Sequence, residues 1–248
     1  MKLHILGSSS KGNCYILETQ REALILEAGV SIKEVRKALR WTPGKAVGVF
    51  VSHEHGDHAA HVREFAEAGI TVFAQCDVLE QQGIKDLPFT YAIRPGKGYT
   101  LGGFSVSGME VKHDVPCLAF LVQHEEMGKL LFVTDTVSFP YTYSGLNTIM
   151  IEANYADDIV NGNVERGSLP LVMRQRLLCS HMELEQTKAV LRAQDLSEVG
   201  SIVLIHLSDN NSDEQRFVRE IRNQTGCPVY AAKAGTTLDI SRNPFWHG

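Results

Sequence analysis

The residues best suited to chemistry are three histidines and one aspartate within a six-residue segment. They are His53, His55, Asp57 and His58 in the run His-Glu-His-Gly-Asp-His. Imidazole and carboxylate together suit zinc, manganese or iron, and neutral imidazole is the most common metal donor. In an extended loop, side chains two positions apart share one side, so His53 and His55 can bind one ion. A turn at Gly56 would direct Asp57 and His58 toward a second ion.

The segments around this motif predict where it lies in the fold. Residues 47–51 read Val-Gly-Val-Phe-Val, which is typical of a buried strand, and residues 59–68 have a helical composition that ends at Gly69. The motif should therefore form a loop between a strand and a helix. The alternative is a loop of solvated histidines, but four donors directly after an apolar strand favour a metal site.

The rest of the chain contains two β-rich halves with interspersed helices. Strands are predicted at residues 2–6, 14–18, 23–26, 71–74, 104–111, 118–123, 129–133, 147–152 and 201–207. Further helices are predicted at residues 31–40, 171–178 and 180–192 and from residue 212 onward, three of them begun by capping boxes at Ser31, Ser180 and Ser212. Because no repeat, linker or low-complexity stretch interrupts this pattern, we expect a single domain over residues 1–248 with helices outside a two-sheet core.

Composition limits the class of protein. A chain of 248 residues with 44% hydrophobic residues can bury a substantial core. Its five scattered cysteines include no Cys-x-x-Cys pair, which predicts a reducing, cytoplasmic location. We expect neither a signal peptide nor a membrane segment. The net charge of −5 argues against a broad basic face for duplex nucleic acid, so a local patch must hold any polynucleotide.

The segment Ser52-His-Glu-His-Gly-Asp-His58 resembles the signature of the metallo-β-lactamase superfamily, in its histidine-rich, two-metal branch. The wider chain is similar to the YycJ/WalJ-type branch of that superfamily. The segments that carry this second resemblance are Gly7-Ser-Ser-Ser-Lys-Gly-Asn-Cys14, Ala28-Gly29, His113-Asp114, Thr134-Asp-Thr136, Glu152-Ala-Asn154 and His206-Leu-Ser-x-Asn-Asn211. The resemblance implies an α/β fold of the αββα four-layer sandwich type.

The resemblance also implies three further metal ligands. His113 would complete the site begun by His53 and His55, Asp135 would bridge two ions, and His206 would bind the second ion. The alternatives are a loop histidine, a turn cap and a buried core histidine, respectively. Seven donors would then hold two divalent ions, zinc or manganese, that share a hydroxide at neutral pH.

Two residues are predicted to take part in catalysis. Asp57 would bind metal and orient the attacking water. His181 resembles a position where relatives keep a histidine outside the metal site, able to hold a phosphate or protonate a leaving group. It can equally be a solvated residue in the first turn of a helix.

Substrate contacts are predicted from polar loops. The loop of residues 8–13 offers amides, hydroxyls and a lysine that suit a phosphate oxyanion, unless it is an ordinary hairpin turn. Arg174 and Arg176 precede His181 and could also face phosphate, although basic residues on helices are usually solvated. The candidate substrate-binding residues are Ser9, Lys11, Asn13, Asn154, Ser208 and Asn211.

At two positions the chain departs from the family pattern. Glu27 stands where relatives usually carry Asp, and it could still orient a ligand histidine. Tyr155-Ala156 stands where relatives carry a His-Asp pair. This change makes the identity of the substrate less certain to follow the family than the metal binding.

Several functions follow from these residues. The branch is regarded as exonuclease-like, which implies a nuclease that releases nucleotides from DNA ends. A cyclic-nucleotide or other small-molecule phosphodiesterase would fit the acidic charge and the change at Tyr155, and thioester, lactone or β-lactam hydrolysis comes third. The alternative outside the enzymes is a regulatory protein that binds metal without catalysis. A structural zinc site needs only four ligands and leaves no open position, whereas this sequence offers seven donors. The expected binding partners are nucleic-acid ends or a small phosphodiester. We expect no membrane association, and a homodimer is a further candidate.

Overall fold

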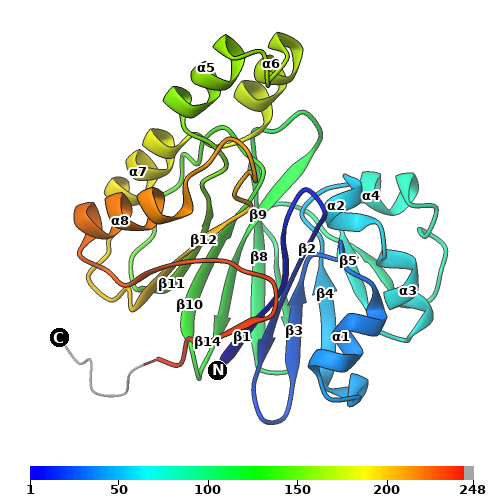
Figure 1. Cartoon of the computed structure of the whole chain (residues 1–248). Helices are drawn as coiled ribbons and strands as arrows, with labels where there is room; N and C mark the ends of the chain where they lie inside the picture. The colour runs from blue at the N-terminus through cyan, green and yellow to red at the C-terminus, as the bar shows by residue number, and fades with distance from the viewer. Residues whose placement is uncertain (243–248) are drawn as a thin grey trace.

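Two seven-stranded sheets form the centre of the molecule in the computed structural model, which describes residues 1–242 (Figure 1). The first sheet has the order β14-β1-β2-β3-β4-β5-β6, and the second has the order β13-β12-β11-β10-β9-β8-β7. The strands of the first sheet are β1 (Lys2–Ser9), β2 (Gly12–Glu18), β3 (Ala23–Leu26), β4 (Ala46–Phe50), β5 (Val72–Ala74), β6 (Thr90–Ala92) and β14 (Thr236–Asp239). Those of the second are β7 (Gly98–Leu101), β8 (Phe104–Val111), β9 (Cys117–His124), β10 (Gly128–Val133), β11 (Leu146–Glu152), β12 (Ser201–Ile205) and β13 (Val229–Ala231).

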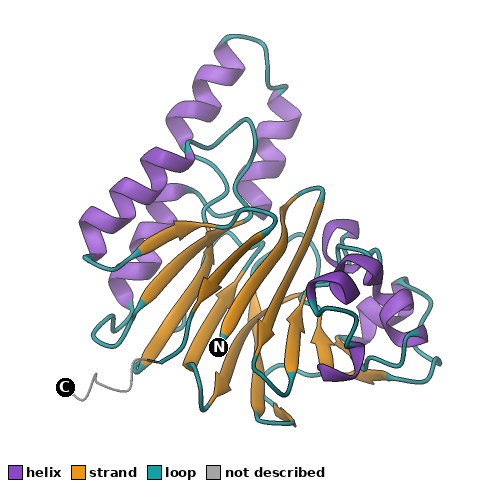
Figure 2. Cartoon of the chain, turned by 60° about the horizontal axis from the view of Figure 1, so that its bottom comes forward, coloured by secondary structure: helices purple, strands orange, loops and turns teal. Residues whose placement is uncertain are grey.

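Helices lie on the outer sides of the two sheets (Figure 2). The first group is α1 (Ile32–Ala38), α2 (Gly56–Ala59), α3 (Val62–Glu67) and α4 (Cys76–Gln81), with a short 3-10 helix at Pro43–Lys45. The second group is α5 (Asp157–Glu165), α6 (Leu171–Ser180), α7 (Leu184–Ala193) and α8 (Glu214–Thr225). The order helix, sheet, sheet, helix confirms the predicted α/β four-layer sandwich.

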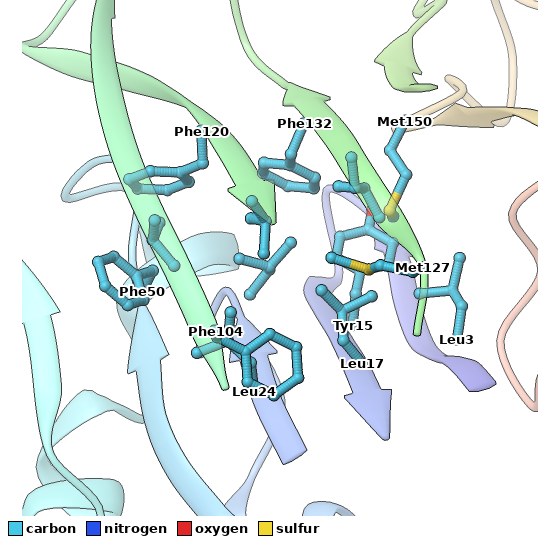
Figure 3. Close-up of a cluster of buried hydrophobic side chains, with 14 of the residues drawn as sticks. Leu3, Tyr15, Leu17, Leu24, Phe50, Phe104, Phe120, Met127, Phe132 and Met150 are labelled. Atoms are coloured by element: carbon cyan, nitrogen blue, oxygen red, sulfur yellow. The ribbon is translucent and has the colours of Figure 1, made fainter. Parts of the chain in front are cut away.

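The two sheets pack against each other through a large apolar core. Aromatic and aliphatic side chains from both sheets meet there, including Phe50 and Tyr15 from one and Phe120, Phe132 and Met150 from the other (Figure 3). The strands of the second sheet are also buried on their other face, against α7 and α8. Burial on both faces explains why β11 and β12 read as nearly continuous apolar runs in the sequence.

The helix starts differ from those predicted. Residues 59–68 belong to two short helices, α2 and α3, in place of one. The helix expected from Ser180 begins at Leu184, because the Glu183 side chain caps it by accepting hydrogen bonds from the backbone N–H groups of Glu185 and Gln186. Ser180 instead ends α6. At Ser31 the start is confirmed, although the serine side chain makes no capping bond.

Both β-rich halves contribute to the same inter-sheet core. On this basis we propose that the chain is a single domain, residues 243–248 lying outside the described residues. Within residues 1–242, no helix combines the length and the apolar character that a membrane crossing requires.

Replacement of Phe132 by alanine tests the role of the inter-sheet core. The Phe132 ring is fully buried, with centroid distances of 5.5 Å to Tyr15 and 6.4 Å to Phe120. Phe132→Ala should lower the free energy of unfolding by about 3–5 kcal/mol, because it removes buried area and leaves a cavity. Urea denaturation measures the change. Val172→Ala, at a side chain 76% exposed, should stay within about 0.5 kcal/mol of the parent, and equal losses in the two variants would contradict this account of the core.

Candidate metal centre

The candidate ligands lie where strands end. The loop that carries His53 to His58 follows β4, while Asp135 and His206 follow β10 and β12. β10, β11 and β12 run parallel, so their carboxyl ends share one edge of the second sheet. In Figure 1 this edge lies at the same end of the molecule as α2, which contains Asp57 and His58. Segments far apart in sequence therefore bring their donors to one place.

A first cluster consists of three histidines. His53 Nε2 lies 3.1 Å from His55 Nδ1, and His113 Nε2 lies 3.3 Å from the same His55 nitrogen. The opposite ring nitrogens are engaged elsewhere, because His53 Nδ1 contacts Ser52 Oγ at 2.8 Å and His113 Nδ1 donates to the Ser180 carbonyl at 2.8 Å. The three remaining nitrogens face a common point and form a candidate metal site.

The spacing of these nitrogens fits a metal ion. Ligand atoms about 2.0–2.1 Å from a tetrahedral zinc lie roughly 3.3 Å from one another. The observed separations of 3.1 and 3.3 Å match that value. Lone pairs that point at each other across such a gap repel unless a cation lies between them. The donor set therefore fits a divalent ion better than a plain hydrogen-bonded cluster.

A second cluster combines two carboxylates with two histidines. His206 Nε2 lies 3.1 Å from Asp57 Oδ2, and His58 Nε2 lies 3.3 Å from both Asp57 Oδ2 and Asp135 Oδ1. All four ligand atoms are close enough to hold one ion. His58 and His206 are almost entirely buried, whereas the Asp57 side chain is 19% exposed. A ligand that reaches the exposed side of Asp57 would therefore approach the second cluster.

Asp135 joins the two clusters. Its Oδ1 lies 3.3 Å from His58 Nε2 in the second cluster, while its Oδ2 lies 3.9 Å from His53 Nε2 in the first. One carboxylate with an oxygen toward each cluster can share its charge between two cations. This arrangement favours the bridging role over a turn cap, and we propose that Asp135 is the shared ligand.

The cluster keeps its buried carboxylates charged. Burial by itself would raise the pKa of Asp135, but the charges of His206 and His58 hold that pKa well below its usual range. For Asp57, the hydrogen bonds to His206 and His58 likewise outweigh burial and lower the pKa. Conversely, burial opposes protonation of His206, yet Asp135, Asp57 and Glu152 raise its pKa to about 10. The carboxylates thus demand positive charge, which divalent cations can supply.

Three residues at the cluster have left-handed backbone conformations. Glu27, Asp135 and His206 have φ values of 68°, 44° and 53°; Glu27 and His206 directly follow β3 and β12, and Asp135 lies two residues after the end of β10. A positive φ is unfavourable for residues other than glycine and is commonly found at functional sites. The chain turns sharply at these points, so the last side chain faces the cluster rather than continuing along the sheet. Glu27 Oε2 lies 3.4 Å from His58 Nδ1, which agrees with the orienting role expected for it.

Glu152 is a residue that sequence reasoning did not place in the site. Its fully buried carboxylate lies 2.7 Å from His181 Nδ1 and 3.3 Å from His206 Nδ1, and it accepts hydrogen bonds from the backbone N–H groups of Thr136 and Met182. It therefore orients both histidines. Its place in the Glu-Ala-Asn segment after an apolar strand was the available signal. His181 directly follows the last residue of α6 and does not begin the next helix, because α7 starts three residues later.

Asp114 was also absent from the predicted site. Its Oδ1 lies 3.0 Å from His113 Nε2 and 3.5 Å from His55 Nε2. With 38% of its side chain exposed, it places a further negative charge at the edge of the first cluster. Its position next to His113 was the signal that could have identified it.

Asn13 has a supporting position in place of the substrate contact predicted for it. It is fully buried, and its Nδ2 lies 3.2 Å from Asp57 Oδ2 and 3.0 Å from His58 Nε2. Its Oδ1 accepts a hydrogen bond from Tyr15 at 3.4 Å, and Tyr15 in turn contacts Ser8, whose Oγ accepts from the His206 N–H. These contacts connect the motif loop in the first sheet to the end of β12 in the second.

A cleft of about 410 Å³ opens over the clusters. Asn154, Ser208 and Asn211, three of the predicted substrate contacts, are among its lining residues, and so is His181. Asn154 also holds the ligand His206, since its Nδ2 donates to the His206 carbonyl at 2.8 Å. The other predicted contacts lie elsewhere: Ser9 accepts a hydrogen bond from Asn13 through its carbonyl, and Lys11 pairs with Asp209 at 2.9 Å on the surface. Ser10 lines the cleft from that loop instead.

Comparison with known proteins agrees with this geometry. The profile of the Metallo-beta-lactamase superfamily matches residues 9–157, so the chain belongs to this superfamily. It is a metal-dependent hydrolase, and its resemblance to the YycJ/WalJ type is confirmed by curated relatives. Exodeoxyribonuclease WalJ of Streptococcus pneumoniae is 26% identical over 241 residues, covering 90% of this chain and 86% of the relative. Exodeoxyribonuclease YycJ of Bacillus anthracis is 28% identical over 234 residues, covering 86% of each chain.

Solved structures agree on the fold. The metallo-beta-lactamase fold protein YhfI from Bacillus subtilis superposes with a TM-score of 0.71 at 17% identity, covering 96% of this chain and 99% of that one. The short form of human tRNase Z superposes with a TM-score of 0.65 at 14% identity, covering 97% and 99%. At these identities the likeness concerns the architecture alone.

Gly29 offers a test of how the Asp57 backbone is held. A Cβ on Gly29 would lie 1.8 Å from the Asp57 carbonyl oxygen and 2.6 Å from the Asn13 nitrogen. Gly29→Ala should therefore displace Asp57 and reduce the divalent metal bound per chain, as measured by plasma mass spectrometry after dialysis. Gly98→Ala, at the start of β7, is the matched control, because a Cβ there meets nothing within 4 Å and the residue lies outside the ligand motif. If the two variants bind equal amounts of metal with unchanged circular dichroism, Gly29 does not position Asp57.

Proposed function

We propose that the chain is a two-metal phosphodiesterase that releases nucleotides from DNA ends. The main support is the pair of donor clusters that share Asp135 beneath an open cleft. The names of the two curated relatives, both exodeoxyribonucleases that match most of this chain, support DNA as the substrate. A structural zinc site would instead be closed by four ligands.

His53, His55 and His113 would hold one ion, and Asp57, His58 and His206 would hold the other, with Asp135 shared. The donor set suits zinc or manganese. When bound, such ions supply Lewis acidity toward a phosphoryl oxygen and lower the pKa of water. Asp57, at the exposed side of the second cluster, would orient the attacking group, and the buried neighbours Asn13 and Glu152 would keep the ligands in place.

His181 is suited to protonate the leaving oxygen. Glu152 holds its Nδ1 at 2.7 Å, which leaves Nε2 of the same ring available to the cleft. A carboxylate partner stabilises the protonated imidazole, and burial is outweighed by Glu152 and Asp135, so the pKa of His181 is raised. The ring also stacks on His206, with 5.3 Å between centroids, and therefore lies beside the second cluster.

The alternative function is hydrolysis of a cyclic nucleotide or another small phosphodiester. The cleft volume of about 410 Å³ favours it, since this value lies toward the small end of the roughly 300–1,000 Å³ of small-molecule sites. Tyr155, which departs from the family pattern, is 3% exposed and forms part of the interior.

All five cysteines are free, which supports a reducing, cytoplasmic compartment.

Metal dependence is tested with end-labelled single-stranded and duplex DNA, RNA and cyclic nucleotides. Chelation should abolish hydrolysis, and addition of zinc or manganese should restore it. Asp57→Ala should lower kcat on DNA more than about 100-fold, because it removes both a ligand and the orienting carboxylate. Asp77→Ala, an exposed aspartate on α4, is the control and should retain full activity. Turnover confined to cyclic nucleotides would eliminate the nuclease proposal.

The role of His181 can be separated from metal binding by the choice of leaving group. His181→Ala should lower kcat on DNA by about 100-fold or more, since an alkoxide leaves poorly without a proton. Bis(p-nitrophenyl) phosphate releases a stable phenolate, so its hydrolysis should decrease far less. His61→Ala, outside both clusters, serves as the control. Equal losses on the two substrates would assign His181 to metal binding and contradict the general-acid role.

A further inference from the structure

Helix α6 is apolar yet takes no part in the described core. Leu171, Val172 and Met173 are 67%, 76% and 48% exposed, and Leu178 is 36% exposed. Of its ten residues only Ser180 is buried, and none belongs to the three hydrophobic clusters. Together with α5 it forms a pair that extends beyond the ends of the strands (Figures 1 and 2). Core packing therefore does not explain its composition.

One side of α6 forms a wall of the cleft over the metal ligands. Met173, Arg176, Leu177 and Ser180 all line this cleft, and their spacing of three, four and seven positions places them on one face of the helix. Leu169, just before the helix, lines it as well. The same cleft contains Asp57, His181 and His206. A ligand on the metals would thus lie against a wall of three aliphatic side chains and one guanidinium.

The segment that contains α6 is basic. Residues 166–182 include three arginines and no Asp or Glu, in a chain of net charge −5. Within residues 1–242, Arg166, Arg174 and Arg176 form no ion pair. Arg166 and Arg174 instead donate hydrogen bonds to the neutral side chains of Asn163 and Asn161. By contrast, Arg216 pairs with Asp158 at 2.6 Å. Of the three, Arg176 lines the cleft over the metal ligands, so its guanidinium can bind a phosphate of a polyanion there.

We propose that α6 is the wall that holds an unpaired DNA strand at its end, with Arg176 on a phosphate next to the cleaved bond and Leu169, Met173 and Leu177 against a base. This inference rests on the proposed nuclease function and narrows its substrate. The aliphatic wall can contact the flat face of a base only where no neighbouring base is stacked on it, and a single strand offers such bases without the melting of a duplex. A small cyclic phosphodiester offers no neighbouring phosphate for a second contact.

The test measures DNA affinity and its salt dependence. A short fluorescein-labelled phosphorothioate oligothymidine is titrated with the metal-loaded protein, and anisotropy gives Kd at several salt concentrations. Arg176→Gln should raise Kd about tenfold, the loss expected for one charge-assisted contact. It should also reduce the slope of log K against log salt by about 0.7, because one phosphate contact with a single strand is lost. Arg174→Gln combined with Arg176→Gln should weaken binding further.

Val172→Gln is the matched control, because Val172 lies on the same helix and is not among the residues that line the cleft. Its Kd and slope should equal those of the parent. An unchanged Kd and slope in Arg176→Gln would overturn the inference, and so would equal weakening of duplex and single-stranded binding. If light scattering shows that the parent is a dimer and that Val172→Gln alone dissociates it, α6 is a self-association surface and the inference again fails.

A separate measurement distinguishes this failure from failure of the proposed function. If the metal-loaded parent hydrolyses neither DNA nor bis(p-nitrophenyl) phosphate, the phosphodiesterase proposal fails. If the parent degrades single-stranded DNA while Arg176→Gln retains the parental KM for it, the hydrolase proposal stands and only the role of α6 is wrong. The inference requires a higher KM on DNA in Arg176→Gln, together with a smaller change on the small diester.

Discussion

The structure depends on one electrostatic constraint, which is that several carboxylates remain ionised inside a protein. Asp135 is 2% exposed, Glu152 is fully buried, and Asp57 joins them from the cleft side. Isolated buried carboxylates would be very costly, so positive charge must lie between them. The imidazoles of both clusters surround Asp135 at distances that suit shared cations. Metal binding and the stability of this interior are therefore two consequences of the same arrangement.

The sandwich supplies the rigidity that this constraint requires. Strands buried on both faces cannot shift without loss of packing, so the residues at their ends have fixed positions. The left-handed conformations of Asp135 and His206 then turn these side chains toward the clusters. Asn13 donates a hydrogen bond to Asp57 in the motif loop, and Ser8 accepts one from the His206 N–H after β12, so these bonds tie the two sheets together beside the ligands. The strands that form the inter-sheet core thus also fix the positions of the ligands.

The metal ligands define a reaction class, whereas the cleft wall selects what enters. A net charge of −5 repels a polyanion, which makes the basic segment around α6 the part of the cleft that compensates. α6 contributes little to the core, so it is free to vary without damage to the sandwich. The division between a rigid ligand set and a substrate wall on a projecting helix pair is consistent with a family that keeps one fold for different substrates.

The sequence by itself determined the local features. The spacing of His53 to His58 after an apolar strand predicted a metal site, and strand patterns together with the family resemblance predicted the four-layer fold. These signals extend over a few neighbouring residues, where side-chain period and composition decide the outcome. Only the tertiary structure decided that Glu152 holds two histidines and that Asn13 is buried beneath the site. Contacts between segments so far apart in sequence depend on how strands pair and where their ends meet, which no local pattern encodes.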